Sequence, residues 1–404
     1  MITSLRQWID DIRSRARIAL FTYEGRRLYC RTFVYTPRTQ ELSLRHTFRL
    51  HDIGTLAPRR LIWWTRFVCA SIFFPFPYRV VVSLPSAHAY SAYETVTIER
   101  DAQHTAPLGR EEFRQAFSHY IGKFVDENRK RATAQTSLHD ADVVLVHNHI
   151  VHVRSGNQFY ALDGKELFSD TPRTLEVGVI QTFIPRNLFS HIVELLPRRA
   201  RVYAWAQEGF HLAYALYRGR MEKRASCKHL PLGVAWVRNS ITQLYRFDGK
   251  RLSFHDSFLF GSRVLYEALH NALLIDKESF LHILSRYKQK TLSTHMRTFI
   301  ANILEQEMMR LLRGIDTFKK PHHLSAVYLN PGVLEEYLSL HPRTRQSVIE
   351  VTQYAGVHTV PVRVDHSCDH GQYADCVMGL GLYHHTPLSA IGKESIRWLL
   401  PHTM

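Results

Sequence analysis

Apolar and polar residues alternate through the middle of the chain in a pattern that predicts three short strands followed by a helix. The strands are expected at 233–237, 241–247 and 251–258. The polar turn between the first two consists of Arg238, Asn239 and Ser240. An Asp-Gly pair, which is typical of a tight hairpin turn, separates the second strand from the third. Gly261 then leads into an apolar helix, so the segment reads as an antiparallel meander that ends in a helix.

The flanking patterns indicate a mixed α/β chain. Residues 107–130 place Phe113, Phe117, Ile121 and Phe124 on one helical face. Further strands are expected at 17–35, 78–84, 141–147, 174–184 and 326–330. Further helices are expected at 185–196 and through most of 270–318. With 404 residues and 45% hydrophobic content, the chain is long enough for two or more domains with real cores.

The central meander resembles the second phosphate-binding hairpin of the actin-like ATPases, most closely that of the bacterial proteins FtsA and PilM. In those families the first strand ends in Asp-x-Gly-Gly-Gly-Thr-Thr-Asp, whereas residues 236–243 of this chain read Trp-Val-Arg-Asn-Ser-Ile-Thr-Gln. The turn Leu162-Asp163-Gly164 and the closing segment 373–382 also resemble family patterns. The resemblance covers about residues 17–385 and depends on the order of the elements.

The resemblance implies an α/β, actin-like fold: a duplicated, ribonuclease-H-like, two-lobed arrangement with an FtsA/PilM-type inserted subdomain. It divides the chain into an N-terminal amphipathic helix, a first actin-like subdomain, the insertion, the first part of a second actin-like subdomain, a helical insertion, and the remainder with a C-terminal helix. The corresponding boundaries are 1–15, 16–106, 107–197, 198–269, 270–320 and 321–404.

The residues that serve nucleotide in the family are replaced. Phe21-Thr22-Tyr23-Glu24 occupies the place of the first Asp-x-Gly-Thr. Trp236 offers no metal ligand where the family has an acid, and Arg238 adds a side chain where the family has glycine. The degenerate cleft positions are Arg238, Asn239, Ser240, Gly261 and Gly332. We therefore expect no catalytic residue, no metal and no cofactor. The alternative is an ATPase that binds ATP with Mg²⁺ and uses unorthodox acids such as Asp248, Asp256 or Glu267.

The charge of the chain suits an anionic partner. Its 52 Lys and Arg residues outnumber 36 Asp and Glu residues, for a formal net charge of +16. The basic residues are spread along the chain without a Lys/Arg block or a nucleic-acid-binding motif, so a nucleic-acid-binding module is only a second alternative.

Two segments are candidates for membrane or partner contact. Residues 2–15 place four apolar side chains on one helical face, and the apolar window 61–77 is shorter than the ~20 residues of a membrane span. The residues concerned are Leu5, Trp8, Ile9 and Ile12 in the first segment, and Trp63 and Trp64 in the second. The segment 388–400 also gathers apolar residues, but less regularly.

Scattered polar residues add little chemistry. Five cysteines, odd in number and far apart, indicate a reducing cytosol. His147 and His149 share one strand face, where metal binding or pH sensing competes with a solvated sheet face, which we favour. The cluster 365–370 is interpreted as a polar loop. The sequence thus predicts a non-catalytic scaffold or adaptor for cell division or type IV pilus-like assembly. We expect it in the cytoplasm, peripheral at the inner membrane face, with division or pilus-assembly proteins or further copies of itself as partners.

Overall fold

The computed structural model describes residues 16–24, 27–36, 41–52, 79–101, 106–196, 202–223, 231–324, 326–330, 363–364, 376 and 387–399. The chain separates into two compact units. Unit 1 comprises Met1–Ala215 and Thr352–Met404, and unit 2 comprises Leu216–Val351. The segments 1–15 and 61–77, and with them Leu5, Trp8, Ile9, Ile12, Trp63 and Trp64, lie outside the described residues, as does the cluster 365–370.

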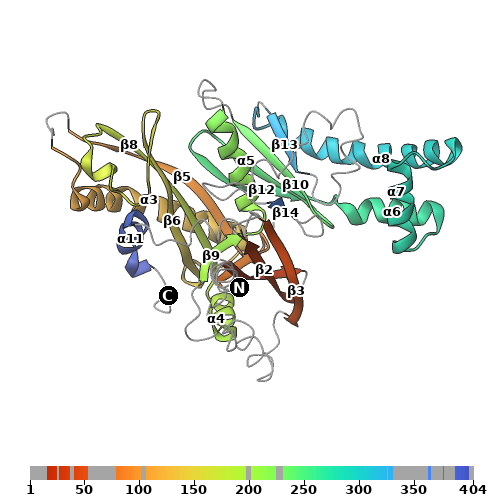
Figure 1. Cartoon of the computed structure of the whole chain (residues 1–404), viewed down its shortest axis with the longest axis horizontal. Helices are drawn as coiled ribbons and strands as arrows, with labels where there is room; N and C mark the ends of the chain where they lie inside the picture. Colours follow the sequence, from red (N-terminus) through yellow and green to blue (C-terminus); the bar gives the residue numbers. More distant parts are fainter. Residues whose placement is uncertain are drawn as a thin grey trace, which may run out of the picture. The chain divides into compact units, whose positions relative to one another are not determined.

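The first sheet of unit 1 has the order β14-β3-β2-β1-β4-β9. Its strands are β1 (Ala16–Glu24), β2 (Arg27–Thr36), β3 (Glu41–Asp52), β4 (Arg79–Leu84), β9 (Val202–Gln207) and β14 (Arg363–Val364). β1, β2 and β3 form an antiparallel meander, while β4 lies parallel to β1 and β9 parallel to β4 (Figure 1). β1 and β4 are almost continuously apolar because the centre of such a sheet is covered on both faces.

A second, antiparallel sheet in unit 1 has the order β5-β8-β6-β7. Its strands are β5 (Tyr90–Glu99), β6 (Val143–Ser155), β7 (Gln158–Tyr160) and β8 (Thr174–Pro185). Helix α3 (Arg110–Thr136) follows β5, and α4 (Arg186–Leu195) follows β8. α3 buries Phe113, Phe117 and Ile121 against the sheet, as their spacing of four residues predicts.

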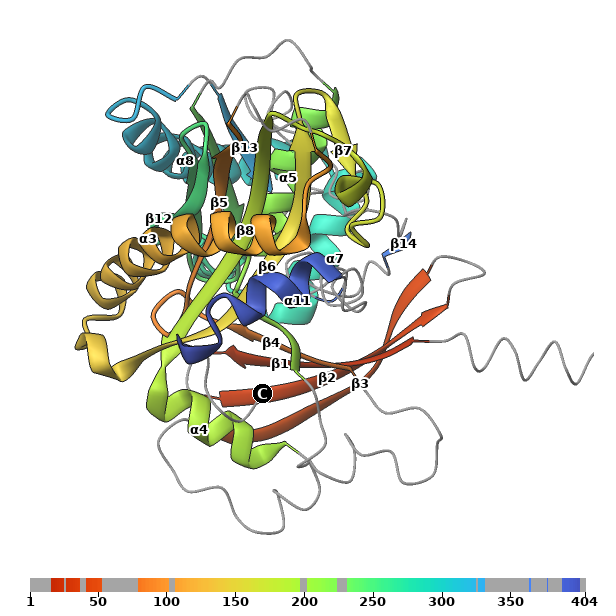
Figure 2. The ribbon, with the colours of Figure 1, turned by 90° about the vertical axis from the view of Figure 1, so that its left-hand side faces the viewer.

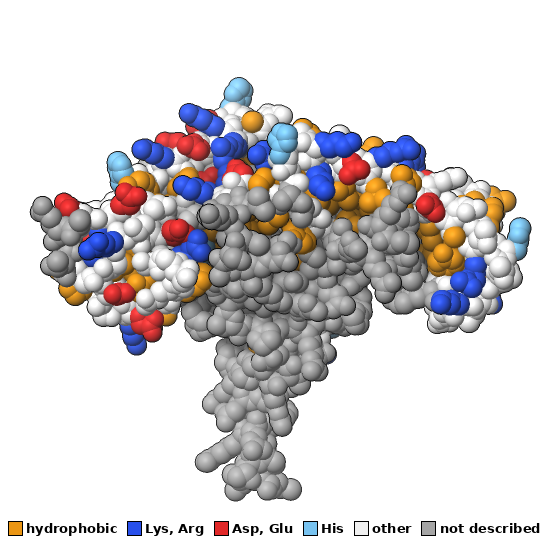
Figure 3. Space-filling model, turned by 90° about the horizontal axis from the view of Figure 1, so that it is seen from above, with side chains coloured by type: hydrophobic (Ala, Val, Ile, Leu, Met, Phe, Trp, Pro, Cys, Tyr) orange, Lys and Arg blue, Asp and Glu red, His pale blue; other side chains and the backbone are white. Residues whose placement is uncertain are grey.

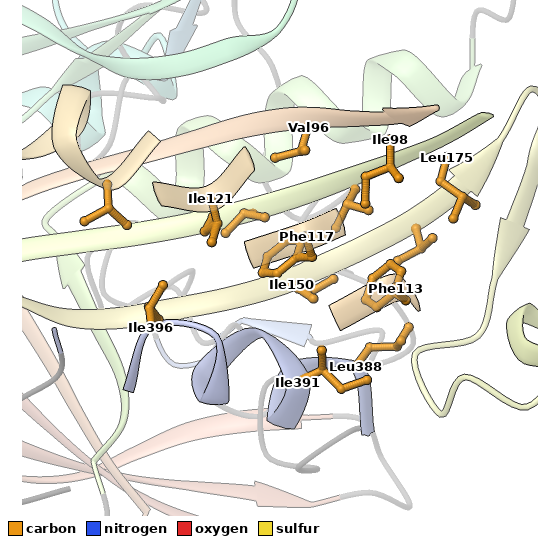
Figure 4. Close-up of a cluster of buried hydrophobic side chains, with 14 of the residues drawn as sticks. Val96, Ile98, Phe113, Phe117, Ile121, Ile150, Leu175, Leu388, Ile391 and Ile396 are labelled. Atoms are coloured by element: carbon orange, nitrogen blue, oxygen red, sulfur yellow. The ribbon is translucent and has the colours of Figure 1, made fainter. Parts of the chain in front are cut away.

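The C-terminal helix α11 (Pro387–Glu394) lies beside α3 on the same sheet (Figure 2). Leu388, Ile391 and Ile396 join the hydrophobic core that contains Phe117 and Ile121 (Figure 4). The segment 388–400 is therefore part of this core. Its irregular phasing has a structural cause, because α11 ends at Glu394 and a short 3₁₀ turn, Arg397–Leu399, follows.

The strand pairing moves two of the boundaries expected from the sequence. We expected the insertion to begin at 107, but β5 pairs with β8 from Tyr90 to Glu99 and so belongs to the inserted sheet. We also expected 321–404 to complete the second half, but 387–399 pack on the inserted sheet in unit 1. In both cases, packing against partners distant in the sequence decides the assignment.

Unit 2 contains the meander that the central pattern predicted, in the order β13-β10-β11-β12. β10 (Leu232–Val237), β11 (Thr242–Phe247) and β12 (Arg251–Phe258) are antiparallel neighbours, and β13 (Ala326–Asn330) lies parallel to β10. The expected Asp-Gly turn joins β11 to β12, with Gly249 at φ 101° and the Asp248 N–H donating to the Arg251 carbonyl.

Helices α6 (Ser262–Leu273), α7 (Lys277–Lys288) and α8 (Thr294–Lys319) follow the meander in unit 2. They share a small core of Leu269, Leu284 and Ile300, and the second half of α8 packs on the sheet through Met308, Leu311 and Phe318. Helix α5 (Phe210–Lys223) connects β9 to this unit. Within the described ranges, none of the helices is long and apolar enough to cross a membrane.

Candidate functional site

The turn between β10 and β11 is closed by its own backbone. The Arg238 N–H donates to the Ile241 carbonyl at 2.9 Å, and Arg238 and Gly261 form an isolated β-bridge. The structure thus brings together four of the five expected cleft positions: Arg238, Asn239, Ser240 and Gly261. Gly332 lies outside the described residues.

The same turn caps the N-terminus of α6. The Ser262 N–H donates to the Arg238 carbonyl at 3.0 Å, and the Arg263 N–H donates to the Asn239 carbonyl at 2.8 Å. The Ser262 hydroxyl also donates to the Asn239 side-chain oxygen at 3.1 Å. A helix N-terminus binds phosphate through amide N–H groups that are free to donate. Here two of these N–H groups already donate to carbonyl oxygens of the turn.

Gly261 makes this close approach feasible. A Cβ at this position would lie 2.4 Å from both the Arg238 and the Asn239 carbonyl oxygens. Its backbone is extended, so contact distance and not a left-handed conformation requires glycine. The glycine therefore serves the contact between the turn and the helix.

Trp236 and Arg238 fill the end of β10. Trp236 is fully buried, next to Gln243 of β11 and Asn330 of β13 in the strand register. The Arg238 guanidinium carbon lies 4.8 Å from the centre of the Trp236 ring, within the range of a cation–π contact. An indole and a guanidinium therefore fill this end of β10.

The end of the β1–β2 hairpin in unit 1 is also filled by side chains. Phe21, Thr22 and Tyr23 are all buried, and the Arg31 guanidinium donates to the Thr22 hydroxyl at 2.7 Å. Burial raises the pKa of the Tyr23 phenol to about 12, so this group stays neutral at physiological pH. This end of the hairpin therefore presents a packed hydroxyl and a buried phenol ring.

One buried acid escaped the sequence interpretation. Glu208 follows β9, and its N–H donates to the Leu84 carbonyl of β4 at 2.7 Å. Glu208 and His211 are both fully enclosed, and Gly209 between them has φ +80°. A signal existed, because Gln207-Glu208-Gly209 separates an apolar strand from an apolar helix at the carboxyl end of a parallel strand, where open α/β sheets bind ligands.

The paired histidines of β6 are also placed differently from our expectation. His147 and His149 do share a face, with rings 5.7 Å apart and nearly parallel. The expected solvated face is wrong, since only 5% and 4% of these residues are exposed. Burial, followed by electrostatic interactions with His149, Lys393 and His211, holds the pKa of His147 well below 6.5.

The repeated strand order identifies the fold. In each unit, three consecutive antiparallel strands are joined by a later strand parallel to the first, β4 beside β1 and β13 beside β10. Unit 1 extends this sheet with β9 and carries an inserted subdomain between β4 and β9. The fold is actin-like. The duplicated sheet and the position of the insertion confirm the α/β, two-lobed class that the sequence resemblance implied.

No protein-family model matches this actin-like chain, and no curated protein matches it. Among solved structures, it is similar to the PilM-PilN type IV pilus biogenesis complex, with 12% identity, a TM-score of 0.47, and coverage of 91% of this chain and 98% of the other. It is also similar to the ethanolamine utilization protein EutJ from Carboxydothermus hydrogenoformans, with 10% identity, a TM-score of 0.34, and coverage of 91% and 90%. A third similar structure is the glucokinase from Balamuthia mandrillaris in complex with glucose, with 9% identity, a TM-score of 0.36, and coverage of 93% and 97%. Because these identities and TM-scores are low, the strand order carries the fold assignment.

Proposed function

We propose that this protein is a non-catalytic, actin-like scaffold or adaptor for cell division or type IV pilus-like assembly at the inner membrane face. The observation that carries the non-catalytic part is the closed turn, in which the Arg238 and Asn239 carbonyls accept hydrogen bonds from the Ser262 and Arg263 amides. Phosphate oxygens would meet carbonyl oxygens there, which repel an anion. The assembly role rests on the resemblance of the sequence to FtsA and PilM. The partners we propose are division or pilus-assembly proteins and further copies of this chain.

Two of the three acids of the rival ATPase interpretation have structural roles. The Asp248 carboxylate accepts the Arg251 N–H within the Asp-Gly turn, and Glu267 pairs with Arg263 on the exposed side of α6. These contacts support the proposal, because the carboxylates stabilise a turn and a helix surface. Basic side chains are also interspersed with acidic ones on the described part of the face seen in Figure 3, a pattern that does not favour a nucleic-acid-binding module.

Isothermal titration of the full chain with ATP, with and without Mg²⁺, tests the non-catalytic part. We expect no heat of binding at millimolar ATP. Micromolar, Mg²⁺-dependent binding that is lost in Arg238→Ala but kept in Arg263→Ala would contradict the proposal. Arg263 is the matched control because its side chain is exposed and paired with Glu267, while its backbone contact to the turn survives the substitution.

Vesicle flotation tests the membrane part. Full chain and a variant without residues 2–15 are each mixed with vesicles of anionic and of neutral lipid. We expect the full chain to float with anionic vesicles and the truncated one to float less, because the apolar face of Leu5, Trp8, Ile9 and Ile12 is lost. Equal flotation of both chains, or of neither, would remove residues 2–15 from the proposal.

A further inference from the structure

Three side chains from separate elements of unit 2 meet at the end of α8. His322, just after α8, has its Nε2 atom 2.8 Å from the Nε2 atom of His255 on β12. The other ring nitrogen of His322, Nδ1, lies 3.3 Å from Nη1 of Arg246 on β11. The two imidazole rings stand nearly perpendicular, with centroids 4.2 Å apart. The three groups therefore form one continuous chain of polar contacts.

An irregularity in the sheet brings the His255 side chain into this series of polar contacts. Tyr245 of β11 pairs with Phe254, but Leu244 pairs with Asp256, so His255 has no residue directly opposite. A β-bulge of this kind redirects the side chain of the extra residue. The ring of Phe318, in the last turn of α8, lies 5.2 Å from the His255 ring and 5.6 Å from the His322 ring. Bulge and phenyl ring together hold His255 towards His322.

The position of Arg246 decides which nitrogens carry protons. A guanidinium group can only donate, so Nδ1 of His322 must accept. The proton of neutral His322 is then on Nε2, which donates to Nε2 of His255, and His255 carries its own proton on Nδ1. Both contacts need both rings to be neutral. A metal ion does not fit this state, because a metal ligand needs the lone pair that the His322 Nε2 proton occupies.

The charges around the pair oppose protonation of either ring. Both rings are partly exposed to solvent. Partial desolvation is the first cause that lowers the pKa of His255, and repulsion from His322 is the second; the positive charge of Arg246 acts in the same direction, and the Asp256 carboxylate opposes it. Partial desolvation, followed by the charge of Arg246 and by His323, also lowers the pKa of His322. Because these pKa values are lowered, the native state resists a proton that the unfolded chain accepts. The contribution of the pair to the stability of the native state is therefore fully present above about pH 6.5 and declines as the pH falls.

We propose that the Arg246–His322–His255 chain is a pH-sensitive latch that fastens the end of α8 to β12 and opens when either imidazole takes up a second proton. A protonated His322 turns a donor towards Arg246, and a protonated His255 turns a donor towards His322, so each protonation replaces a hydrogen bond by repulsion. The turn that follows α8, held by the His323 N–H to the Lys320 carbonyl and the Leu324 N–H to the Lys319 carbonyl, then loosens. This turn joins the helical part of unit 2 to β13.

Hydrogen exchange of the full chain, read by mass spectrometry on peptides covering 319–324, tests the latch. Protection factors are taken relative to intrinsic exchange at pH 7.5 and pH 5.5. In the wild-type chain we expect protection to fall about five- to tenfold at the lower pH, the equilibrium equivalent of about one net hydrogen bond. In His255→Gln the side-chain oxygen replaces the Nε2 acceptor without titrating, so only His322 can still open the latch and the fall in protection should be clearly smaller than in the wild type. His255→Lys, which keeps a positive charge at both pH values, should give low protection throughout.

His295→Gln is the matched control, since His295 is exposed at the start of α8; this variant should behave as the wild type does. Nitrogen-15 spectra of the wild-type histidines at pH 7.5 keep the test decisive if His255→Lys does not fold, because they report the tautomers directly. A proton on Nδ1 of His322 would overturn the latch. The same pH dependence in His255→Gln as in the wild type, or protection of the turn by Zn²⁺ that His255→Gln abolishes, would also overturn it.

Discussion

Replacing Gly261 by alanine tests the contact between the turn at 238–240 and α6. The added Cβ would lie 2.4 Å from the Arg238 and Asn239 carbonyl oxygens, which is too close for either to stay in place. Both are backbone atoms that accept the Ser262 and Arg263 N–H groups, so relief of the clash must break or stretch those hydrogen bonds. Overpacking of this kind costs about 1–3 kcal/mol.

Gly122→Ala provides the control. Gly122 lies within α3, and a Cβ there meets nothing within 4 Å. Alanine in an open helical position is expected to stabilise by about 0.5–1 kcal/mol, because glycine is the poorer helix former. The two glycine-to-alanine changes should therefore have opposite signs.

Two measurements read the effect of Gly261→Ala. Urea denaturation gives the change in the free energy of unfolding, and hydrogen exchange of peptides covering 234–264 shows whether the loss is local. We expect the Ser262 and Arg263 amides to exchange faster in the variant while α3 is unchanged. A stability change within about 0.5 kcal/mol of zero, the size of an ordinary surface substitution, with unaltered exchange at 262–263 would refute the close packing on which the closed turn depends.

Two further predictions concern the inserted subdomain. Leu388→Ala should destabilise by about 2–5 kcal/mol, since Leu388 is fully buried in the core beneath α11, whereas the exposed control Glu394→Ala should change urea unfolding little; equal effects would mean that α11 is not docked. His147→Gln should flatten the fall in stability between pH 7 and pH 5. Burial holds the pKa of His147 below 6.5, so the unfolded wild-type chain takes up a proton there that the native chain does not. His119→Gln, at an exposed site on α3, should leave the pH profile as it is.

Local patterns were enough to predict the strands of unit 2. The alternation around 233–258 and the Asp-Gly turn specify hairpins through contacts between neighbours in the sequence, and β10, β11 and β12 lie within one residue of the expected bounds. The sequence also predicted that Arg238, Asn239 and Ser240 form the turn between the first two of these strands, and the structure places them there.

Features that depend on distant partners were not predicted. The capping of α6 consists of hydrogen bonds between backbone groups, and the identity of the side chains does not specify which backbone groups pair. His147 and His149 look solvated because they are polar, yet they are buried. Helix α11 packs closely at Gly392, where an added Cβ would lie 3.3 Å from the Ile150 side chain and 3.5 Å from the Phe117 ring. The sequence shows a glycine at that point but not the close approach that it permits.

The central claim, that the turn at 238–240 is closed to phosphate, is tested most directly by hydrogen exchange at Ser262 and Arg263 with and without millimolar Mg·ATP. The account predicts the same slow exchange in both conditions, because these amides already donate to the Arg238 and Asn239 carbonyls. A nucleotide-dependent change at these two amides, absent when the Mg²⁺ is removed, would show that the turn opens to bind phosphate and would contradict the account.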